Sequence, residues 1–182
     1  LAFNKAPAGA IAIYDPEIGY WSSTHGVAPG GSKRFALASI TKMATAAVIF
    51  QLADEKKLQL GDAISRWFPG LPNSELITVD HLLSHTSGLM SPGAGETDNH
   101  TRSITWPSEE WKRWAGGNEF CPGARWDYSN HGYVLLARIA EQIDGASFPD
   151  IVDRRIAKPL GLTAFGIVRP GGEGALVAPG EP

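Results

Sequence analysis

A serine and a lysine one helical turn apart offer this chain a nucleophile. Ser39 and Lys42 form its only Ser-x-x-Lys spacing, where a short apolar lead passes into a long helical pattern. Side chains three residues apart share a helix face, so the ammonium can activate the hydroxyl while the helix N-terminus holds an anion. The pair also fits an ordinary helix start, because serine is a favoured N-cap residue and lysine is common in helices.

A second candidate group is the run Tyr128-Ser129-Asn130, directly before another helical pattern. A tyrosine near a lysine can have its pKa lowered and act as a general base. Asn130 offers both a donor and an acceptor to an amide-like substrate. Alternatively, Tyr128 packs in the core and Asn130 caps the following helix. Taken singly, each of the two patterns favours the structural interpretation.

The composition argues against several other classes of protein. The 16 basic and 19 acidic residues give a net charge of -3 without a long charge run, which indicates neither a nucleic-acid surface nor a polybasic membrane anchor. The longest apolar run is too short to cross a bilayer. The first residues lack the order of a signal peptide, and a secreted, a periplasmic and a cytoplasmic location all stay open.

The single cysteine limits the chemistry further. Cys121 alone excludes an internal disulfide and any multi-cysteine metal site. It lies in Phe120-Cys121-Pro122-Gly123, and a free cysteine usually behaves as a small hydrophobic residue. We therefore expect Cys121 to be a small buried filler.

The elements that must position these residues are two strands followed by helices. Residues 10–14 and 20–24 are β-branched or aromatic runs around a turn, which predicts a β-hairpin. We expect the central helix from Ser39 to about Lys57, with its N-terminal half buried because that half is apolar nearly all round. Shorter helices are expected at 63–67, at 79–84 after the N-cap Thr78, from 107, at 133–143 and at 149–158. A hairpin is not stable alone and needs more strands or helices against it.

Four motifs follow one another in an order that resembles a known family. They are Ser39-Ile40-Thr41-Lys42; His81-Leu82-Leu83-Ser84-His85-Thr86-Ser87-Gly88-Leu89; Pro122-Gly123 before Tyr128-Ser129-Asn130; and Pro159-Leu160-Gly161-Leu162. Together they resemble the serine β-lactamase-like hydrolases, the branch of class C β-lactamases, D-alanyl-D-alanine carboxypeptidases and β-lactamase-like esterases. The resemblance covers residues 9–163.

The resemblance implies an α+β fold of the β-lactamase/transpeptidase type and a site without cofactor or metal. It implies a single incomplete domain over residues 1–182, in which the hairpin (1–34) belongs to a central sheet. The nucleophile helix and a helical subdomain occupy residues 35–165, and a Gly/Pro-rich tail occupies 166–182.

The resemblance also implies a role for each candidate residue. Ser39 is similar to the nucleophile that forms an acyl-enzyme, and its backbone N–H to one oxyanion-hole donor. Lys42 is similar to the residue that activates this serine. Tyr128 resembles the general base that later protonates the leaving group, and Asn130 the residue that holds the substrate amide. The implied function is a serine hydrolase acting on an ester, a β-lactam or a D-amino-acid peptide.

The histidines admit other interpretations. His81 and His85 stand at the spacing of two zinc ligands, but a catalytic zinc needs a third ligand and usually a glutamate base. The resemblance implies instead that they brace the helix end and the turn after it. A Ser-His-Asp hydrolase using His85 or His131 is a further alternative, which the placement of Lys42 makes unnecessary.

The sequence departs from the family after Leu162. Family members continue into further strands, one of which carries Lys-Thr-Gly or His-x-Gly and a second oxyanion donor, and neither triplet follows here. Loss of such a donor costs on the order of a hundredfold in rate. The chain is thus a fragment, one piece of a protein whose second chain or second copy completes the sheet, or a shortened protein. The alternative function is a catalytically impaired or non-catalytic scaffold that needs a second chain.

Overall fold

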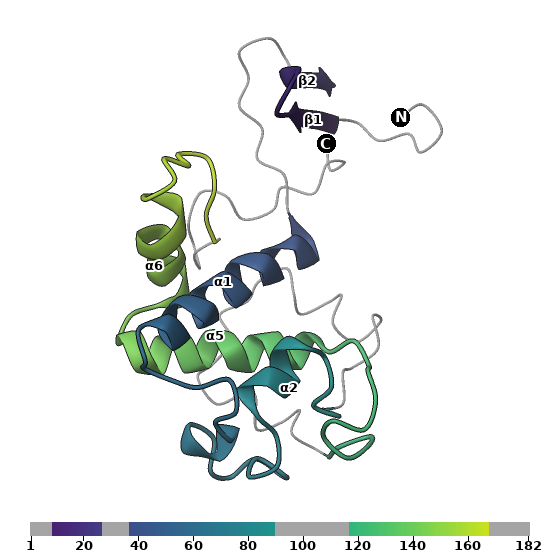
Figure 1. Ribbon diagram of the computed structural model, residues 1–182, viewed down its shortest axis with the longest axis vertical. Helices are drawn as coiled ribbons and strands as arrows, with labels where there is room; N and C mark the ends of the chain where they lie inside the picture. Colours follow the sequence, from purple (N-terminus) through teal and green to yellow (C-terminus); the bar gives the residue numbers. More distant parts are fainter. Residues whose placement is uncertain (1–8, 27–36, 90–116, 168–182) are drawn as a thin grey trace, which may run out of the picture. The chain divides into compact units, whose positions relative to one another are not determined.

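The computed structural model describes residues 9–26, 37–89 and 117–167. These residues belong to two compact units, a β-hairpin within 9–26 and a helical unit over 37–167 (Figure 1). The helix expected from residue 107 and the part of the Gly/Pro-rich tail from 168 onward lie outside the described residues. Both stay predictions, as does the division of the chain into three parts of one domain.

The predicted hairpin is present. Strands β1 (Gly9–Asp15) and β2 (Gly19–His25) pair antiparallel in register across a tight turn. The Asp15 carboxylate accepts the backbone N–H groups two and three residues further on, both at 2.8 Å, and Gly19 closes the turn with a φ of 98°. A side chain at that φ would be strained, so the turn suits aspartate and glycine at these positions.

Both faces of the hairpin are exposed. Ile13 lies directly opposite Trp21, and these side chains are 53% and 54% exposed. Tyr14 and Tyr20 form a pair on the other face and are more exposed still. Because two strands alone are marginal in water, we keep the prediction that further strands or helices cover this hairpin.

The nucleophile helix has one packed side and one exposed side. It consists of a 3-10 turn, Ala38–Ile40, followed by α1 (Thr41–Asp54). Val48 and Leu52 are fully buried, whereas Met43 is 72% exposed. The predicted burial of the N-terminal half is therefore confirmed for the side that carries Ala44 and Val48 but not for the side of Met43. An apolar composition shows which sides can be buried, and neighbours among the described residues cover only one of them.

The remaining elements of the helical unit follow the predicted order. They are the 3-10 turn η3 (Ile64–Arg66), α2 (Val79–Leu83), α5 (Asn130–Asp144), α6 (Phe148–Val152) and a π-helical turn η5 (Asp153–Ala157). Gly145 ends α5 in the left-handed conformation with a φ of 64°, which glycine adopts without strain. The helix expected at 149–158 is thus one α-helical turn that widens into a π-helical one.

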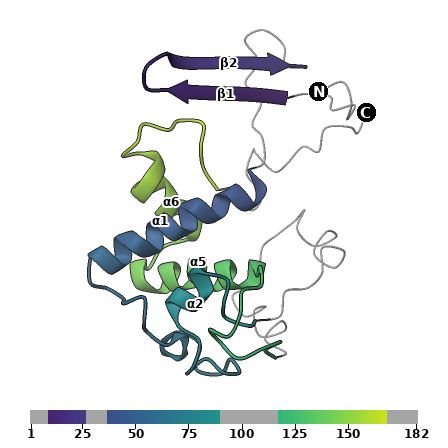
Figure 2. The ribbon, with the colours of Figure 1, turned by 45° about the vertical axis from the view of Figure 1, so that its right-hand side comes forward.

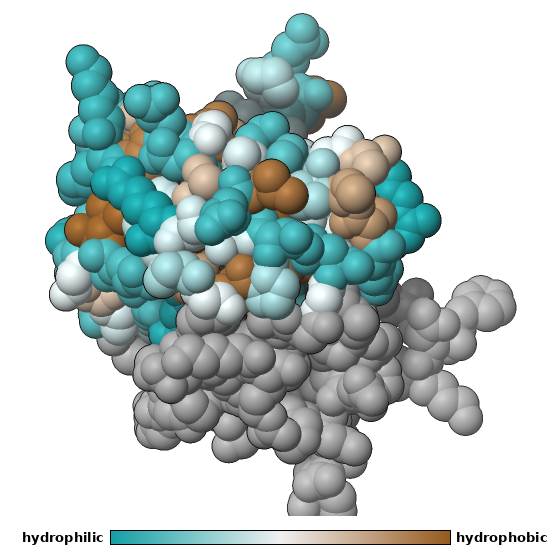
Figure 3. Space-filling model, turned by 90° about the horizontal axis from the view of Figure 1, so that it is seen from below, coloured by the Kyte–Doolittle hydropathy of each residue, from teal (hydrophilic) through white to brown (hydrophobic). Residues whose placement is uncertain are grey.

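Helix α5 lies at the centre of the helical unit. It contacts α1, α2 and α6, and both ribbon views show α1 running alongside it (Figures 1 and 2). The fully buried side chains between these helices include Val48, Leu82, Leu136, Ile139 and Ile151. The face of the described residues seen in Figure 3 is mainly hydrophilic with scattered hydrophobic residues. The core therefore joins the helices that carry the predicted site residues.

Candidate active site

The Ser39 hydroxyl is not used as a helix cap. Ser39 lies inside the 3-10 turn, and the residue that caps α1 is Ile40, whose side chain has no polar atom. Ala38, immediately before Ser39, has a φ of 46°. This left-handed conformation is uncommon for alanine and costs about 1–2 kcal/mol. The serine thus follows a strained residue, and its hydroxyl is left for other partners.

The structure brings all four predicted site residues together. The Tyr128 hydroxyl hydrogen-bonds Ser39 Oγ at 2.7 Å. Lys42 Nζ lies 3.3 Å from the same Ser39 oxygen and donates to Asn130 Oδ1 at 2.7 Å. These contacts join residues up to 89 positions apart in the sequence. The serine hydroxyl therefore faces a phenol and an ammonium at the N-terminal end of α1.

Tyr128 has an altered acidity at this place. Burial of the phenol would raise its pKa, but hydrogen bonding with Lys42 and with Ser39, and the Lys42 charge, lower the pKa by more. The Lys42 ammonium also lies 4.8 Å from the centre of the Tyr128 ring, where a cation is attracted to the aromatic face. The phenolate form is therefore more accessible than in a free tyrosine.

Asn130 is free for Lys42 because Ser129 caps the helix. Ser129 Oγ accepts the Gly132 N–H at 3.2 Å and so satisfies one donor at the start of α5. The alternative in which Asn130 is the cap is wrong. The alternative in which Tyr128 packs in the core is also wrong, since Tyr128 is 38% exposed.

The His81–Leu89 motif shapes the segment that carries Tyr128. The backbone carbonyls of His85, Thr86 and Gly88 accept N–H groups of residues 127, 123 and 119 at 2.8–2.9 Å. Gly88 has a φ of 72°, and a Cβ there would lie 2.2 Å from the Phe120 carbonyl oxygen. The glycine is thus required by a close backbone approach. The motif acts as a template for the loop that presents the tyrosine.

His81 has a structural role, but it braces the start of α2 and not the helix end, where the resemblance placed it. Its Nδ1 accepts the Thr78 N–H, and the Thr78 hydroxyl accepts the His81 N–H, each at 3.2 Å. This reciprocal pair is a capping box with histidine in the place of the usual glutamate. The ring of His81 also lies close beside Gly123, where a Cβ would be 3.2 Å from Nε2.

His85 supports the site in a way that spacing alone did not show. Its Nδ1 accepts the Ser129 N–H at 3.1 Å, and its ring centre lies 4.6 Å from that of Tyr128 and 5.1 Å from that of Tyr133. Burial and the charge of Lys42 lower its pKa. Since His85 is engaged with Ser129, the geometry does not support a Ser-His-Asp centre through His85; His131 is buried in the first turn of α5.

Two further results concern other kinds of site. Cys121 is exposed, so its assignment as a buried filler is wrong. Residues 9–26, 37–89 and 117–167 contain no group of three or more His, Cys, Asp or Glu side chains that could hold a metal ion. Within the same ranges no helix has the length and apolar character that a membrane crossing needs.

A comparison with known families agrees with this geometry. A β-lactamase family model matches residues 4–181, nearly the entire chain. The chain belongs to the β-lactamase family. The resemblance drawn from the four motifs is thereby confirmed, and so is the α+β fold class that it implied.

Several relatives in this family have names that state an activity. Penicillin-binding protein 4* of Bacillus subtilis is 34% identical over 161 residues, which are 86% of this chain and 36% of that protein. Esterase EstB of Burkholderia gladioli is 31% identical over 151 residues, 74% of this chain and 38% of that protein. A solved D-stereospecific amidohydrolase from Streptomyces sp. has a TM-score of 0.76 and 32% identity, with 88% of this chain and 52% of that chain covered.

These relatives define what the family membership means for this chain. It is a member of a serine hydrolase family, as predicted. It spans little more than a third of the length of these two curated relatives, at 36% and 38%, and about half of the solved amidohydrolase, at 52%. Its own reaction, substrate and partners are therefore matters for proposal.

Proposed function

We propose that this chain carries the acylating centre of a serine hydrolase, with Ser39 as the nucleophile. The observation that carries the proposal is the arrangement around Ser39 Oγ, which has the Tyr128 hydroxyl at 2.7 Å and the Lys42 ammonium at 3.3 Å. Lys42 is in turn fixed by Asn130 at 2.7 Å. A nucleophile, a base within hydrogen-bond reach and a group that orients the base are the parts that covalent catalysis requires.

The acylation step follows from these contacts. Tyr128, in the phenolate form that Lys42 stabilises, takes the proton of Ser39 as Oγ bonds to the substrate's carbonyl carbon. The resulting oxyanion is stabilised by the Ser39 backbone N–H at the positive end of the helix. When the intermediate collapses, the C–N or C–O bond breaks, and Tyr128 returns the proton to the leaving group. Ser39 then holds the acyl group as an ester.

Deacylation uses the same groups in reverse. A water molecule gives its proton to Tyr128 as its oxygen bonds to the acyl carbon, and the bond to Ser39 Oγ breaks. The proton then returns from Tyr128 to Ser39, which restores the free enzyme. No cofactor enters either step, so we propose that the site works without one.

We propose an ester, a β-lactam or a D-amino-acid peptide or amide as the substrate. Asn130 accepts from Lys42 through Oδ1, so its amide nitrogen can donate to a carbonyl on the acyl side of a substrate. The relatives are named as a penicillin-binding protein, an esterase and a D-stereospecific amidohydrolase. Penicillins, esters and amides share a carbonyl with a leaving group.

Intact-mass spectrometry after incubation with a penicillin or a fluorophosphonate tests the proposal. We expect one adduct, mapped to Ser39, which disappears in Ser39→Ala and persists in Ser84→Ala, where the lost hydroxyl bonds the Asp80 carbonyl instead. A chain that is folded by circular dichroism and acquires no adduct at high probe concentration would refute the role of Ser39.

We also propose that a second chain or a second copy supplies strands that complete the sheet. The exposed residues of both hairpin faces, among them Ile13 and Trp21 at 53% and 54%, support this proposal, because unpaired strand edges and apolar faces favour pairing. Sedimentation should then detect a species heavier than the 19.5 kDa monomer. If the chain is a monomer and the backbone amides of both strands are nevertheless protected from hydrogen exchange, the proposal of added strands is refuted.

A further inference from the structure

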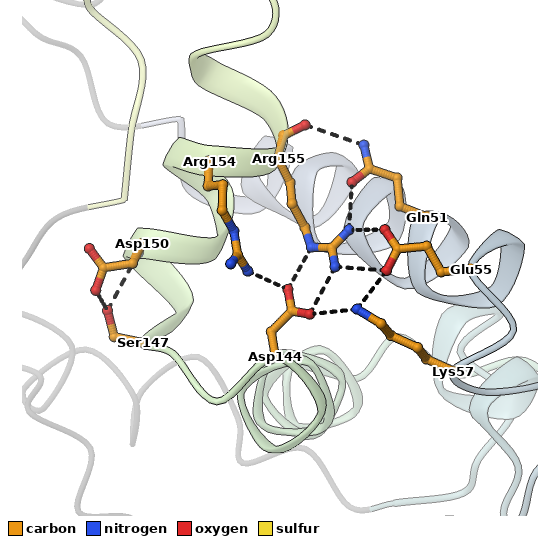
Figure 4. Close-up of polar contacts among 8 residues, drawn as sticks. All are labelled: Gln51, Glu55, Lys57, Asp144, Ser147, Asp150, Arg154 and Arg155. Carbon is orange, nitrogen blue, oxygen red and sulfur yellow. Dashed lines mark hydrogen bonds and ion pairs between the residues drawn. The ribbon is translucent and has the colours of Figure 1, made fainter.

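A cluster of charged side chains joins the C-terminal ends of α1 and α5 (Figure 4). At its centre is Arg155, on the π-helical turn η5. Its guanidinium bonds Asp144 through Nε at 2.6 Å and Nη2 at 2.8 Å. The same group bonds Glu55 through Nη1 at 2.6 Å and Nη2 at 3.0 Å. We call Arg155 with these two carboxylates the Arg155 clamp.

The Arg155 clamp is more than an exposed ion pair. The Asp144 side chain is 3% exposed and that of Arg155 is 11% exposed. Asp144 is the last residue of α5, where a negative charge opposes the helix dipole. Lys57 and Arg154 also contact this carboxylate, at 3.3 and 2.7 Å. Hydrogen bonding to Arg155 is the main cause that lowers the pKa of Asp144 to about 2, so the group stays charged at neutral pH.

The backbone of Arg155 is tied to α1 as well. In a regular helix its carbonyl would accept the N–H of residue 159, but Pro159 has none. Gln51 Nε2 donates to this carbonyl at 3.3 Å instead. Gln51 Oε1 in turn accepts a hydrogen bond from Arg155 Nη1 at 3.4 Å. Pro159 opens the Pro-Leu-Gly-Leu motif, so this motif contributes to holding Arg155 against α1.

The clamp and the candidate active site lie at opposite ends of the same two helices. Lys42 near the start of α1 bonds Asn130 at the start of α5. Glu55 just after α1 and Asp144 at the end of α5 are joined by Arg155. The two helices therefore run in the same direction (Figure 2). They are linked by polar contacts at both ends.

We infer that Arg155 is a positioning residue for the active site, because its clamp fixes the angle between α1 and α5 and so the Lys42–Asn130 contact. This inference rests on the proposed function. At 1.5 Å per residue, the arm from Glu55 to Lys42 is about 20 Å long. A rotation of about 3° at the clamp moves the far end by about 1 Å, a displacement that can cost about a hundredfold in rate.

Two variants loosen the clamp to different degrees. Arg155→Met removes the two links that Arg155 makes. Lys57 still bonds Glu55 at 2.7 Å and Asp144 at 3.3 Å, and Arg154 still bonds Asp144, so the buried charge keeps partners and the two ends keep a weaker link. Glu55→Gln is milder, because it weakens the link to α1 and keeps the contact between Arg155 and Asp144. Arg155→Lys keeps the charge but lacks the planar fork that bonds both carboxylates at once.

Two control variants separate positioning from plain loss of stability or charge. Ile151→Val removes one methylene from a fully buried side chain of α6 and lowers stability without touching the clamp. Lys158→Met removes an ion pair with Asp153 that lies within one segment and joins no helices. All variants are compared at a temperature where each remains folded.

The first readout is the pKa of Tyr128, followed by NMR of ring-labelled tyrosine and assigned with Tyr128→Phe. If the clamp holds Lys42 in place, Arg155→Met raises this pKa towards the ordinary value of tyrosine, Glu55→Gln raises it less, and Arg155→Lys restores it in part. Ile151→Val and Lys158→Met leave it unchanged. An unchanged pKa in a folded Arg155→Met variant overturns the inference.

The second readout is the rate at which a fluorophosphonate labels Ser39. We expect a fall of about 10- to 100-fold in Arg155→Met and a smaller fall in Glu55→Gln. If the wild type is labelled and all variants are labelled at the same rate, the positioning role of Arg155 is refuted, whereas the proposed function is unaffected. A wild type that is never labelled refutes the proposed function, and the Tyr128 pKa then still decides the positioning role.

Discussion

Removal of the Tyr128 hydroxyl should strongly slow acylation while the fold stays intact. Tyr128→Phe deletes one oxygen, 2.7 Å from Ser39 Oγ, and keeps the ring that packs on His85. Tyr128 is 38% exposed, so water can take over the lost hydrogen bond to Ser39. We therefore expect the free energy of unfolding to change by less than about 0.5 kcal/mol.

The kinetic effect should be much larger than the effect on stability. Loss of a general base typically costs about 10²–10⁴ in rate, or roughly 3–5 kcal/mol in the activation free energy. Lys42 still lies 3.3 Å from Ser39 Oγ in the wild-type structure, and its positive charge still stabilises the ionising hydroxyl while water takes up the proton less efficiently. We therefore expect the lower part of the range, about 10²–10³.

Tyr133→Phe provides the matched control. Its hydroxyl donates to the Leu83 carbonyl at 3.0 Å, at the end of α2, and its ring also faces His85. Loss of this bond should destabilise the fold by about 1 kcal/mol, because the carbonyl loses its partner. The acylation rate should stay close to that of the wild type, since the hydroxyl that bonds Ser39 Oγ belongs to Tyr128.

Stopped-flow acylation by a chromogenic ester, together with urea unfolding, measures both effects. We expect each variant to change only one of the two quantities: Tyr128→Phe lowers the acylation rate, and Tyr133→Phe lowers the free energy of unfolding. Acylation of Tyr128→Phe at the wild-type rate would show that Tyr128 is not the base. Equal rate losses in both variants would mean that the Tyr128 hydroxyl has no special role as the base, since the Tyr133 hydroxyl bonds the Leu83 carbonyl instead.

Three further predictions follow from individual contacts. Gly88→Ala should lower the free energy of unfolding by more than about 2 kcal/mol, because its Cβ would lie 2.2 Å from the Phe120 carbonyl oxygen. The control Gly61→Ala should change this free energy little, because a Cβ there would have nothing within 4 Å. Urea unfolding of the two variants compares these effects. Burial and the Lys42 charge lower the pKa of His85 from 6.5, so its neutral ring stabilises the fold fully above pH 6.5, and this contribution is lost as the pH falls through the lowered pKa. His85→Gln should remove that part of the pH dependence of urea unfolding, and an identical pH profile in the two proteins would contradict the assignment. The exposed Cys121 should react with one equivalent of a thiol reagent in the native chain, and a thiol that reacts only after denaturation would show that it is buried.

Local patterns predicted the elements of the fold well. The β-branched or aromatic runs at residues 10–14 and 20–24, the spacing of Tyr133 to Ile143 and the cap at Thr78 all correspond to observed elements. The closeness of Ser39 and Lys42 also follows from helix geometry. These features depend on neighbours within a few residues, and the sequence displays such neighbours directly.

Features that depend on distant neighbours were predicted less well. The contact of Ser39 with Tyr128, 89 positions away, was expected only from the order of the family motifs. The burial of α1 was overestimated, since its apolar residues cannot show which side is covered. Cys121 was assigned to the interior from its neighbours in sequence, but it lies in an exposed turn region. The Arg155 clamp was missed because its members come from three segments.

If Tyr128 activates Ser39 as proposed, their separation in the sequence also determines when the serine can become reactive during protein synthesis. The Ser39–Lys42 pair forms as soon as α1 does, but Tyr128 is 89 residues further along the chain. At roughly 5–20 residues per second, the ribosome needs about 5 to 20 seconds more to make it. A nascent chain with α1 folded therefore still has an ordinary serine. In the proposed mechanism, its reactivity therefore develops only after α5 has packed beside α1.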